Sequence, residues 1–284
     1  MIERFKIILK DIKFEHTVFS LPFALMSAFL AAEGIPQLNK LFWIVTAIVG
    51  ARSCAMAFNR IVDVVYDGSN PRTSNRALPS GKVKLHHYLI FLLVSALLFL
   101  FSCYMLNAMA FQLSLPALII IFFYSFTKRF TSNSHLFLGL ALSLAPIGAW
   151  VAVREEISLI SIILGVAVLL WLAGFDIIYA CQDINFDKRH GLFSIPRRYG
   201  ITKALRLSSI FHVLMVISVL SLIMTDQLGF LYLTGVALVA ILLWYEHSIV
   251  KPDDLSRINV AFFNVNGVIS IMLMLFVLID CVWI

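Results

Sequence analysis

The chain has 284 residues, of which 61% are apolar and only 13% are charged, and its formal net charge is +6. Apolar runs of membrane-spanning length recur from end to end. No segment between them is long enough to fold as a soluble domain, which excludes a soluble globular protein. We therefore predict an all-α polytopic membrane protein with a single integral-membrane domain over residues 1–284.

In chain order, an amphipathic segment comes first and nine apolar runs come after it. Residues 1–16 place five apolar side chains among four cations, which predicts an interfacial helix that leads into the first span. A cleavable signal peptide is the alternative interpretation, but the apolar stretch starts late and no convincing cleavage site follows it. We predict nine membrane helices in a bundle, at about 17–32, 41–62, 86–108, 112–127, 135–153, 157–179, 203–225, 228–247 and 257–283.

The positions of Lys and Arg predict the orientation of these spans. A cytoplasmic N-terminus puts eighteen of the twenty-two basic residues on the cytoplasmic side, leaves Lys40 and Arg154 outside, and places Arg52 and Arg60 within the second span. We therefore expect a multi-pass protein of a bacterial-type inner (plasma) membrane. Because the cations are spread over separate loops, they predict contacts with the lipid bilayer and a phosphorylated ligand. They do not indicate a nucleic-acid partner, and no obligate protein partner is evident.

Two pairs of aspartates stand at the ends of apolar runs. Asp63 and Asp67 are four residues apart, and so are Asp183 and Asp187. Four predicted spans separate the pairs, so both pairs should reach the same membrane surface. A carboxylate at the edge of hydrocarbon is costly and therefore indicates a functional site. We predict that these pairs lead into two cytoplasmic active-site loops, at 66–85 and 181–202.

Further polar side chains extend each pair along one helix face. Asn59 lies one turn before Asp63, while Tyr179 and Asp176 lie one and two turns before Asp183. Carboxylate and amide oxygens suit Mg²⁺, which takes one or two carboxylates, keeps waters and bridges to substrate phosphate oxygens. Two facing clusters of this kind would hold a diphosphate through more than one metal ion.

Cations near the aspartates would complete a diphosphate site. Guanidinium forks suit phosphate oxygens, and negative charge on a departing diphosphate is stabilised by cations and metal ions. The alternative is that these cations only obey the positive-inside rule. In a membrane, the natural compound with a diphosphate head and an apolar tail is a prenyl diphosphate, whose allylic cation an aromatic ring could trap. The cations in reach by sequence are Arg72, Arg76, Lys128, Arg129, Lys188, Arg189, Arg197 and Arg198.

Three stretches resemble the motifs of the UbiA superfamily of intramembrane prenyltransferases. Residues 59–81, NRIVDVVYDGSNPRTSNRALPSG, resemble the first motif, N-x-x-x-D-x-x-x-D followed by R-T-x-x-R. Residues 176–200, DIIYACQDINFDKRHGLFSIPRRYG, are similar to the second motif, and YSFTKRFT at 124–131 resembles the segment after the fourth span. With nine spans in the expected order, the resemblance covers essentially the whole chain.

The resemblance implies roles for the residues that match the motifs. It implies that basic positions near the phosphates are Arg72, Lys128 and Arg129, and we expect Arg76 and Lys188 to add to this diphosphate site. It also implies that Mg²⁺ and the diphosphate are held by Asn59, Asp63, Asp67, Asp183 and Asp187. The four aspartates of this group are the catalytic residues that we expect.

The same comparison suggests an acceptor site deeper in the membrane. Arg52 lies two turns before Asn59 and would pair with the carboxylate of an aromatic acid, although an acidic side chain of the protein is an alternative partner. We place Tyr179 and Asp176 in the same acceptor-binding group. Tyr179 would orient the phosphate or line the acceptor pocket, and its alternative role is that of an interfacial anchor.

One departure from the family pattern concerns the acceptor. Many 4-hydroxybenzoate prenyltransferases have Asp directly after the motif Asn, where this chain has Arg60. The chain looks more like the branch often labelled UbiA-like 4-hydroxybenzoate polyprenyltransferase. We expect Mg²⁺-dependent transfer from polyprenyl diphosphate to a hydroxylated aromatic carboxylic acid, as in ubiquinone biosynthesis. The alternative acceptor is 1,4-dihydroxy-6-naphthoate, in the futalosine-type route to menaquinone.

Two other classes of protein compete with this interpretation. A secondary transporter also has intramembrane carboxylates and paired halves, but its charges should lie near the midplane on interrupted helices. A non-catalytic membrane scaffold leaves the recurring aspartate spacing unexplained. In this sequence the carboxylates lie at predicted helix ends beside basic loops, which favours the enzyme.

Overall fold

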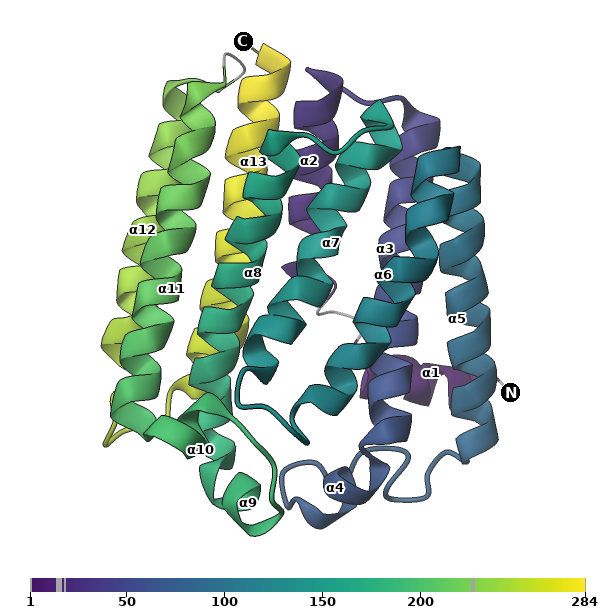
Figure 1. Ribbon diagram of the computed structural model, residues 1–284, viewed down its shortest axis with the longest axis vertical. Coiled ribbons are helices and arrows are strands. Elements are labelled where there is room, and N and C mark those ends of the chain that lie inside the picture. The colour runs from purple at the N-terminus through teal and green to yellow at the C-terminus, as the bar shows by residue number, and fades with distance from the viewer. Residues whose placement is uncertain (1, 14–16, 18, 226–227, 284) are drawn as a thin grey trace.

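The protein, seen in a computed structural model that describes residues 2–13, 17, 19–225 and 228–283, is built of helices. Its elements are α1 (Ile2–Asp11), α2 (Leu21–Ala32), α3 (Leu38–Val62), α4 (Val64–Ser69), α5 (Leu85–Leu106), α6 (Ala108–Thr127), α7 (Ser134–Arg154), α8 (Leu159–Ala180), η2 (Cys181–Asp183), α9 (Ile184–Arg189), α10 (Ile195–Tyr199), α11 (Ile201–Ser221), η3 (Leu222–Met224), α12 (Phe230–Ile249), η4 (Val260–Val265) and α13 (Asn266–Trp283). The long helices form one bundle, and α1 lies across it near its lower end (Figure 1).

Eight helices of the described chain are long and apolar enough to cross a membrane, and they correspond to eight of the nine predicted spans. Among the described residues of the first predicted span, at 17–32, the α-helix is α2, which has twelve residues. At 1.5 Å per residue such a helix covers about 18 Å, against about 30 Å of hydrocarbon. Its length is set by Pro22 in its first turn and by Glu33, whose left-handed φ of 53° ends the helix. Residues 14–16 and 18 of the predicted segments lie outside the described residues.

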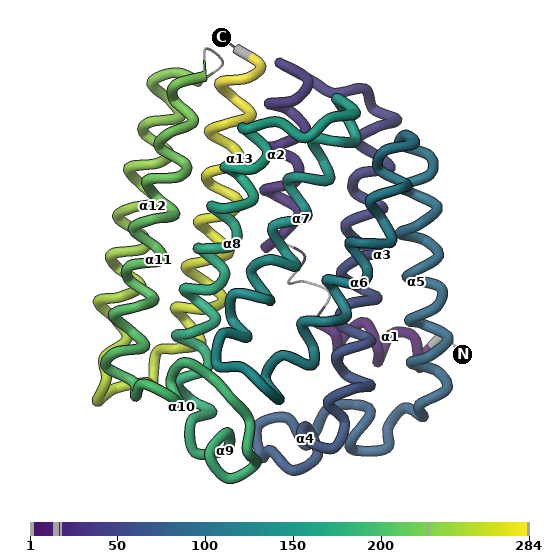
Figure 2. Tube along the Cα trace, in the orientation of Figure 1, coloured from purple at the N-terminus to yellow at the C-terminus, as the bar shows by residue number. Residues whose placement is uncertain are grey.

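The chain direction brings both acidic motifs to one end of the bundle. Helices α3 and α8 both run downward in Figure 1, and each continues at its lower end into a short helix, α4 or α9. The tube in Figure 2 follows both turns, and α10 lies beside α9. This arrangement agrees with the even number of spans predicted between the motifs.

A buried ion pair attaches α1 to the bundle. The Asp11 carboxylate lies 3.4 Å from Nε of Arg60, and Arg60 is 4% exposed. The backbone carbonyl of Asp11 also accepts a hydrogen bond from the Arg60 guanidinium. The Asp11 carboxylate also accepts bonds from the Tyr88 hydroxyl (2.5 Å) and from the backbone N–H of Ala77 (2.9 Å). One carboxylate therefore joins α1 to α3, α5 and the loop after the first motif.

Small residues set the closest helix contacts, as expected where lipid provides no hydrophobic drive for association. A Cβ atom on Gly139 of α7 would stand 2.5 Å from the backbone oxygen of Leu169 on α8. A Cβ atom on Gly50 of α3 would stand 2.9 Å from the backbone nitrogen of Phe99 on α5. Helix α8 is the most buried of the candidate spans, so its contact with α7 fixes the centre of the bundle.

We predict that Gly139→Ala lowers the thermal unfolding midpoint of the detergent-solubilised protein. The new methyl group meets the α8 backbone, which cannot rotate aside, and overpacking of this kind costs about 1–3 kcal/mol. Gly148→Ala is the matched control, because Gly148 lies on the same helix and a Cβ there meets nothing within 4 Å. Equal midpoints for the two variants would contradict this account of the α7–α8 contact.

Candidate functional site

A cavity of about 850 Å³ opens at the end of the bundle that carries both acidic motifs. Its lining comes from α1, α3, α4, the loop after α4, α6, α7 and the connection between them, α8, η2, α9 and η4. Lys188, predicted to bind diphosphate, is exposed and is absent from this lining, as are Arg189, Arg197 and Arg198. The structure brings together at this cavity the other predicted site residues, namely Arg52, Asn59, Asp63, Asp67, Arg72, Arg76, Lys128, Arg129, Asp176, Tyr179, Asp183 and Asp187.

Both motifs have the same backbone break at their first aspartate. Asp63 ends α3 with φ −95° and ψ 9°, and Asp183 precedes α9 with φ −96° and ψ 4°. This bridge conformation interrupts each long helix, and a six-residue helix then carries Asp67 or Asp187. The two halves therefore share a local geometry as well as an aspartate spacing.

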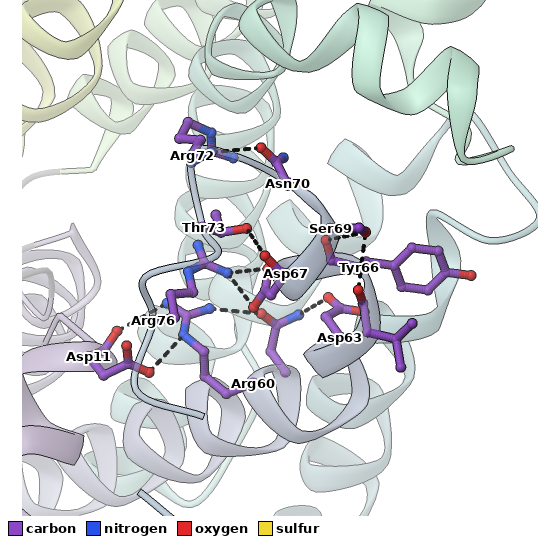
Figure 3. A network of polar contacts seen from close by, with 12 residues as sticks. Asp11, Arg60, Asp63, Tyr66, Asp67, Ser69, Asn70, Arg72, Thr73 and Arg76 are labelled. Atoms are coloured by element: carbon purple, nitrogen blue, oxygen red, sulfur yellow. Dashed lines mark hydrogen bonds and ion pairs between the residues drawn. The ribbon is translucent and has the colours of Figure 1, made fainter. Parts of the chain in front are cut away.

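In the first motif, each carboxylate faces a cation. Asp63 accepts a hydrogen bond from Nδ2 of Asn59 at 2.9 Å and another from Nη2 of Arg129 at 3.3 Å. Both oxygens of Asp67 lie 2.6 Å from Nη1 of Arg76 (Figure 3). The Thr73 hydroxyl bonds the backbone carbonyl of Asp67, which holds the loop after α4 against the short helix.

In the second motif, Asp183 is held by a residue from the first half of the chain. The Arg72 guanidinium donates to both of its oxygens, from Nε at 3.1 Å and Nη2 at 2.6 Å. The remaining Nη1 donates to the Tyr179 hydroxyl at 3.0 Å. Asp187 is 1% exposed and accepts a bond from the Ser194 hydroxyl at 2.7 Å. Arg72 thus bridges the two motifs across the cavity.

Lys128 is the cation shared by both motifs. Burial lowers the pKa of its ammonium group, but surrounding carboxylates outweigh that effect and keep the pKa above its ordinary value. Burial raises the pKa of Asp63, and the negative charge of Asp67 raises it further, despite the bond from Arg129. The carboxylates that raise the Lys128 pKa are Asp187, Asp176, Asp183 and Asp63. The site therefore favours a positive charge placed next to Asp63.

Asp176, predicted to bind the acceptor, has an internal partner that the sequence did not reveal. Its Oδ2 lies 2.6 Å from Nδ1 of His135, which is fully buried at the start of α7. The backbone N–H of Ile195 points to His135 Nε2 at 3.3 Å. Because a backbone N–H only donates, Nε2 accepts and Nδ1 carries the proton toward Asp176. The carboxylate is still 20% exposed and lines the cavity, so it remains open to a ligand.

Arg52 lies in the deeper part of the cavity, on the α3 helix two turns before Asn59. Its Nη2 lies 3.5 Å from the backbone carbonyl of Lys13, and the Lys13 ammonium lies 4.7 Å from the centre of the Phe263 ring. The segment after α1 therefore contributes cationic character to the same region. Arg52 and Lys13 together make the deep part of the cavity suitable for an anionic group.

An aromatic wall faces these cations. The Phe262 ring lies 4.2 Å from the Tyr179 ring and 5.0 Å from the Phe175 ring, measured between centroids. Phe262 and Phe263 both line the cavity because η4 is a π-helical turn with one residue more than an α-helical turn.

Buried side chains hold this π-helical turn in place. The Asn266 amide donates to the Ala261 carbonyl and to Glu246, both at 3.0 Å, and accepts a 2.7 Å bond from the Trp171 indole. Asn266 and Glu246 are both fully buried. The wall of the cavity is thus fixed by a polar cluster inside the bundle.

The arrangement separates a charged mouth from an apolar interior. The four aspartates, with Arg72, Arg76, Lys128 and Arg129, line the mouth, while Leu138, Leu142 and Leu172 line the interior. This division suits a ligand with a polyanionic head and a hydrocarbon tail. Sequence spacing found most of the mouth, whereas His135 and Ser194 lie 41 and 7 residues from the aspartates they bind and carry no motif of their own.

Comparisons with known proteins agree with this site. The model of the UbiA prenyltransferase family matches residues 20–268. A 4-hydroxybenzoate octaprenyltransferase of Vibrio parahaemolyticus is 32% identical over 84% of both chains, and one of Vibrio atlanticus is 30% identical over 86% of both.

Solved structures show the same fold. The apo structure of a UbiA homolog from Aeropyrum pernix K1 is 34% identical with a TM-score of 0.85, covering 94% of this chain and 98% of that chain. A UbiA homolog from Archaeoglobus fulgidus bound to DMAPP and Mg²⁺ is 20% identical with a TM-score of 0.75, covering 97% and 98%. The present chain therefore belongs to the UbiA prenyltransferase family and is a multi-pass membrane prenyltransferase.

Proposed function

We propose that this protein transfers a polyprenyl group from polyprenyl diphosphate to a hydroxylated aromatic acid of the 4-hydroxybenzoate type, with Mg²⁺ as its cofactor. The observation that carries the proposal is the single cavity in which two aspartate pairs, four cations and Arg52 meet above an apolar interior. The relatives named 4-hydroxybenzoate octaprenyltransferase support this acceptor class. Membership of a prenyltransferase family removes the secondary transporter as an alternative.

The donor set at the mouth fits Mg²⁺ bound together with a substrate. Among the described residues, no three acidic, His or Cys side chains form a ready-made metal cage. This suits Mg²⁺, which binds through one or two carboxylates and completes its shell with waters and phosphate oxygens. When bound, Mg²⁺ would supply positive charge to the departing diphosphate. The residues that would hold it are Asn59, Asp63, Asp67, Asp183 and Asp187.

The protein's own cations would exchange partners when the diphosphate binds. Arg72 and Arg76 now bond carboxylates, and the same forks suit phosphate oxygens. As the allylic carbon–oxygen bond breaks, its electron pair leaves with the diphosphate. The aromatic ring then forms the new carbon–carbon bond and loses a ring proton, which passes to the departed diphosphate or to water. Arg52 would orient the acceptor by binding the acceptor's carboxylate, and the aromatic wall would lie beside the acceptor's ring.

One observation keeps 1,4-dihydroxy-6-naphthoate as a second candidate acceptor. Arg60, which stands where many 4-hydroxybenzoate enzymes have Asp, is committed to Asp11 and also donates to Oδ1 of Asn59 at 3.3 Å. In this chain a cation contacts the motif Asn at the position where those enzymes have a carboxylate. We further propose that the active site faces the cytoplasm from a bacterial-type inner membrane, because the basic loops lie at the end that carries the motifs.

The proposed metal site predicts the effect of removing single aspartates. Replacing any one of Asp63, Asp67, Asp183 and Asp187 by Ala should lower the Mg²⁺-dependent release of pyrophosphate about 100-fold or more. The protein should remain inserted, because these groups add nothing to apolar packing. Asp253→Ala, which removes an exposed carboxylate outside the cavity, should leave the rate unchanged. Near-normal rates in two of the four variants would rule out the two-cluster site.

Arg72 and Lys188 form a matched test, because the sequence predicts that both bind diphosphate but only Arg72 lines the cavity. Arg72→Gln should raise KM for prenyl diphosphate about tenfold and change KM for the aromatic acid little, because the fork beside Asp183 is lost. Lys188→Gln should change neither constant, because Lys188 lies outside the cavity lining. Kinetics at varied concentrations of both substrates give these values. A larger effect on the acceptor than on the diphosphate would reverse the assignment of Arg72.

Arg52 provides the test of acceptor recognition. Arg52→Ala should raise KM for the aromatic acid about 10–100-fold, and Arg52→Lys should recover part of the loss because an ammonium lacks the bidentate fork. A phenol without the carboxylate should be a poor substrate of the parent enzyme and lose little further in the variant. If Arg52→Ala still prefers the acid to the phenol as strongly as the parent does, the carboxylate is bound elsewhere.

A further inference from the structure

A second cavity, of about 360 Å³, lies outside the catalytic cavity at the same end of the bundle. It is lined by the turn after α6, by the segment that leads into α10 and by α10 itself. None of its lining residues also lines the catalytic cavity. The lining consists of Phe130, Thr131, Ser132, Phe193, Ser194, Arg197 and Arg198.

The two arginines of this cavity are fixed in position. The Arg197 guanidinium donates to the Leu192 carbonyl and lies 5.0 Å from the centre of the Phe193 ring. The Arg198 guanidinium donates to the Ser132 hydroxyl at 3.2 Å and lies 5.1 Å from the Tyr199 ring. Each guanidinium thus has one hydrogen bond and one aromatic ring against it, although Arg198 as a residue is exposed.

These guanidiniums have donors to spare for an anion. Within the described residues, each makes one hydrogen bond to the protein, through Nη1, and neither lies within ion-pair distance of a carboxylate. Thr131 and Ser132, whose side chains carry hydroxyls, line the same space. Paired guanidiniums and hydroxyls are the groups that bind a phosphate.

An apolar stripe leads from the membrane to this cavity. Five exposed side chains follow one face of α6 and the turn after it, at spacings of four, four, three and four residues. The rings of Phe123 and Phe130 lie 6.0 Å apart, which confirms that the stripe continues past the end of the helix. From the middle of the membrane toward the cavity the stripe is Leu115, Ile119, Phe123, Phe126 and Phe130.

We propose that this second cavity binds the phosphate of an anionic membrane phospholipid, with one acyl chain along the α6 stripe. Arg197 and Arg198 hold the headgroup, and Phe130 and Phe193, which are 55% and 40% exposed, mark the level where headgroup and chain meet. The site is built on the segment that supports the second acidic motif, since Ser194 bonds Asp187 and the Phe193 N–H bonds the Lys128 carbonyl.

Lipid retention by the purified full-length protein tests this site without using catalysis. Native mass spectrometry after reconstitution with equal amounts of phosphatidylglycerol and phosphatidylcholine should show preferential retention of phosphatidylglycerol. The double variant Arg197→Gln/Arg198→Gln should weaken this retention about tenfold or more. Lys203→Gln/Arg206→Gln removes the same charge from exposed positions of α11 nearby and should have little effect. Equal losses in the two double variants, or no preference in the parent, would overturn the proposal.

Two further measurements distinguish a lipid from free phosphate and guard against misfolding. Phe123→Ser/Phe130→Ser should weaken retention of phosphatidylglycerol several-fold and leave the binding of inorganic phosphate unchanged. Arg197→Lys/Arg198→Lys keeps the charge and should retain an intermediate amount of lipid, because the forks are lost. Competition by inorganic phosphate, with no effect of the Phe substitutions on lipid retention, would show a phosphate site and overturn the lipid assignment.

Discussion

The balance of opposite charges inside one cavity is the constraint on which the rest of the structure depends. Four aspartates and four cations line its mouth, and Asp176 lines the same cavity. A buried carboxylate that loses its cation leaves an uncompensated charge, which is strongly destabilising. Arg72 illustrates the effect of this balance on the fold, because its bonds to Asp183 and Tyr179 hold the loop after α4 against α8. The short helices and loops at this end are thus positioned by the same charges that would meet a diphosphate.

Much of the site can be predicted from local spacing and from topology. Asp63 and Asp67, like Asp183 and Asp187, share a helix face at i, i+4, and an even number of intervening spans returns the second pair to the side of the first. Both facts are visible in the sequence. The partners are not visible, because Arg72 and Asp183 are separated by 111 residues and meet only through the packing of the bundle.

Other features depend on tertiary contacts that hydropathy and motif spacing do not encode. The first span was predicted from an apolar run, but Pro22 and Glu33 limit the helix to twelve residues. Lys188 comes directly after an aspartate motif yet does not line the cavity, because it is exposed and successive residues of a helix lie about 100° apart, so that the face of α9 with Asp187 is not the face with Lys188. Arg60 stands out as a departure from the family pattern, and its partner Asp11 lies on a helix that no motif marks.

The π-helical turn at Val260–Val265 makes the shape of the cavity depend on chain length at one point. A π-helical turn amounts to a single inserted residue in an α-helix. Removing one residue there would restore the α-helix and rotate the preceding part by about 100°. Since Asn266 is anchored to Trp171 and Glu246, the rotation would fall on Phe262 and Phe263 and turn them from the cavity. A relative with identical aspartate motifs but one residue fewer here would present its substrates with a different wall.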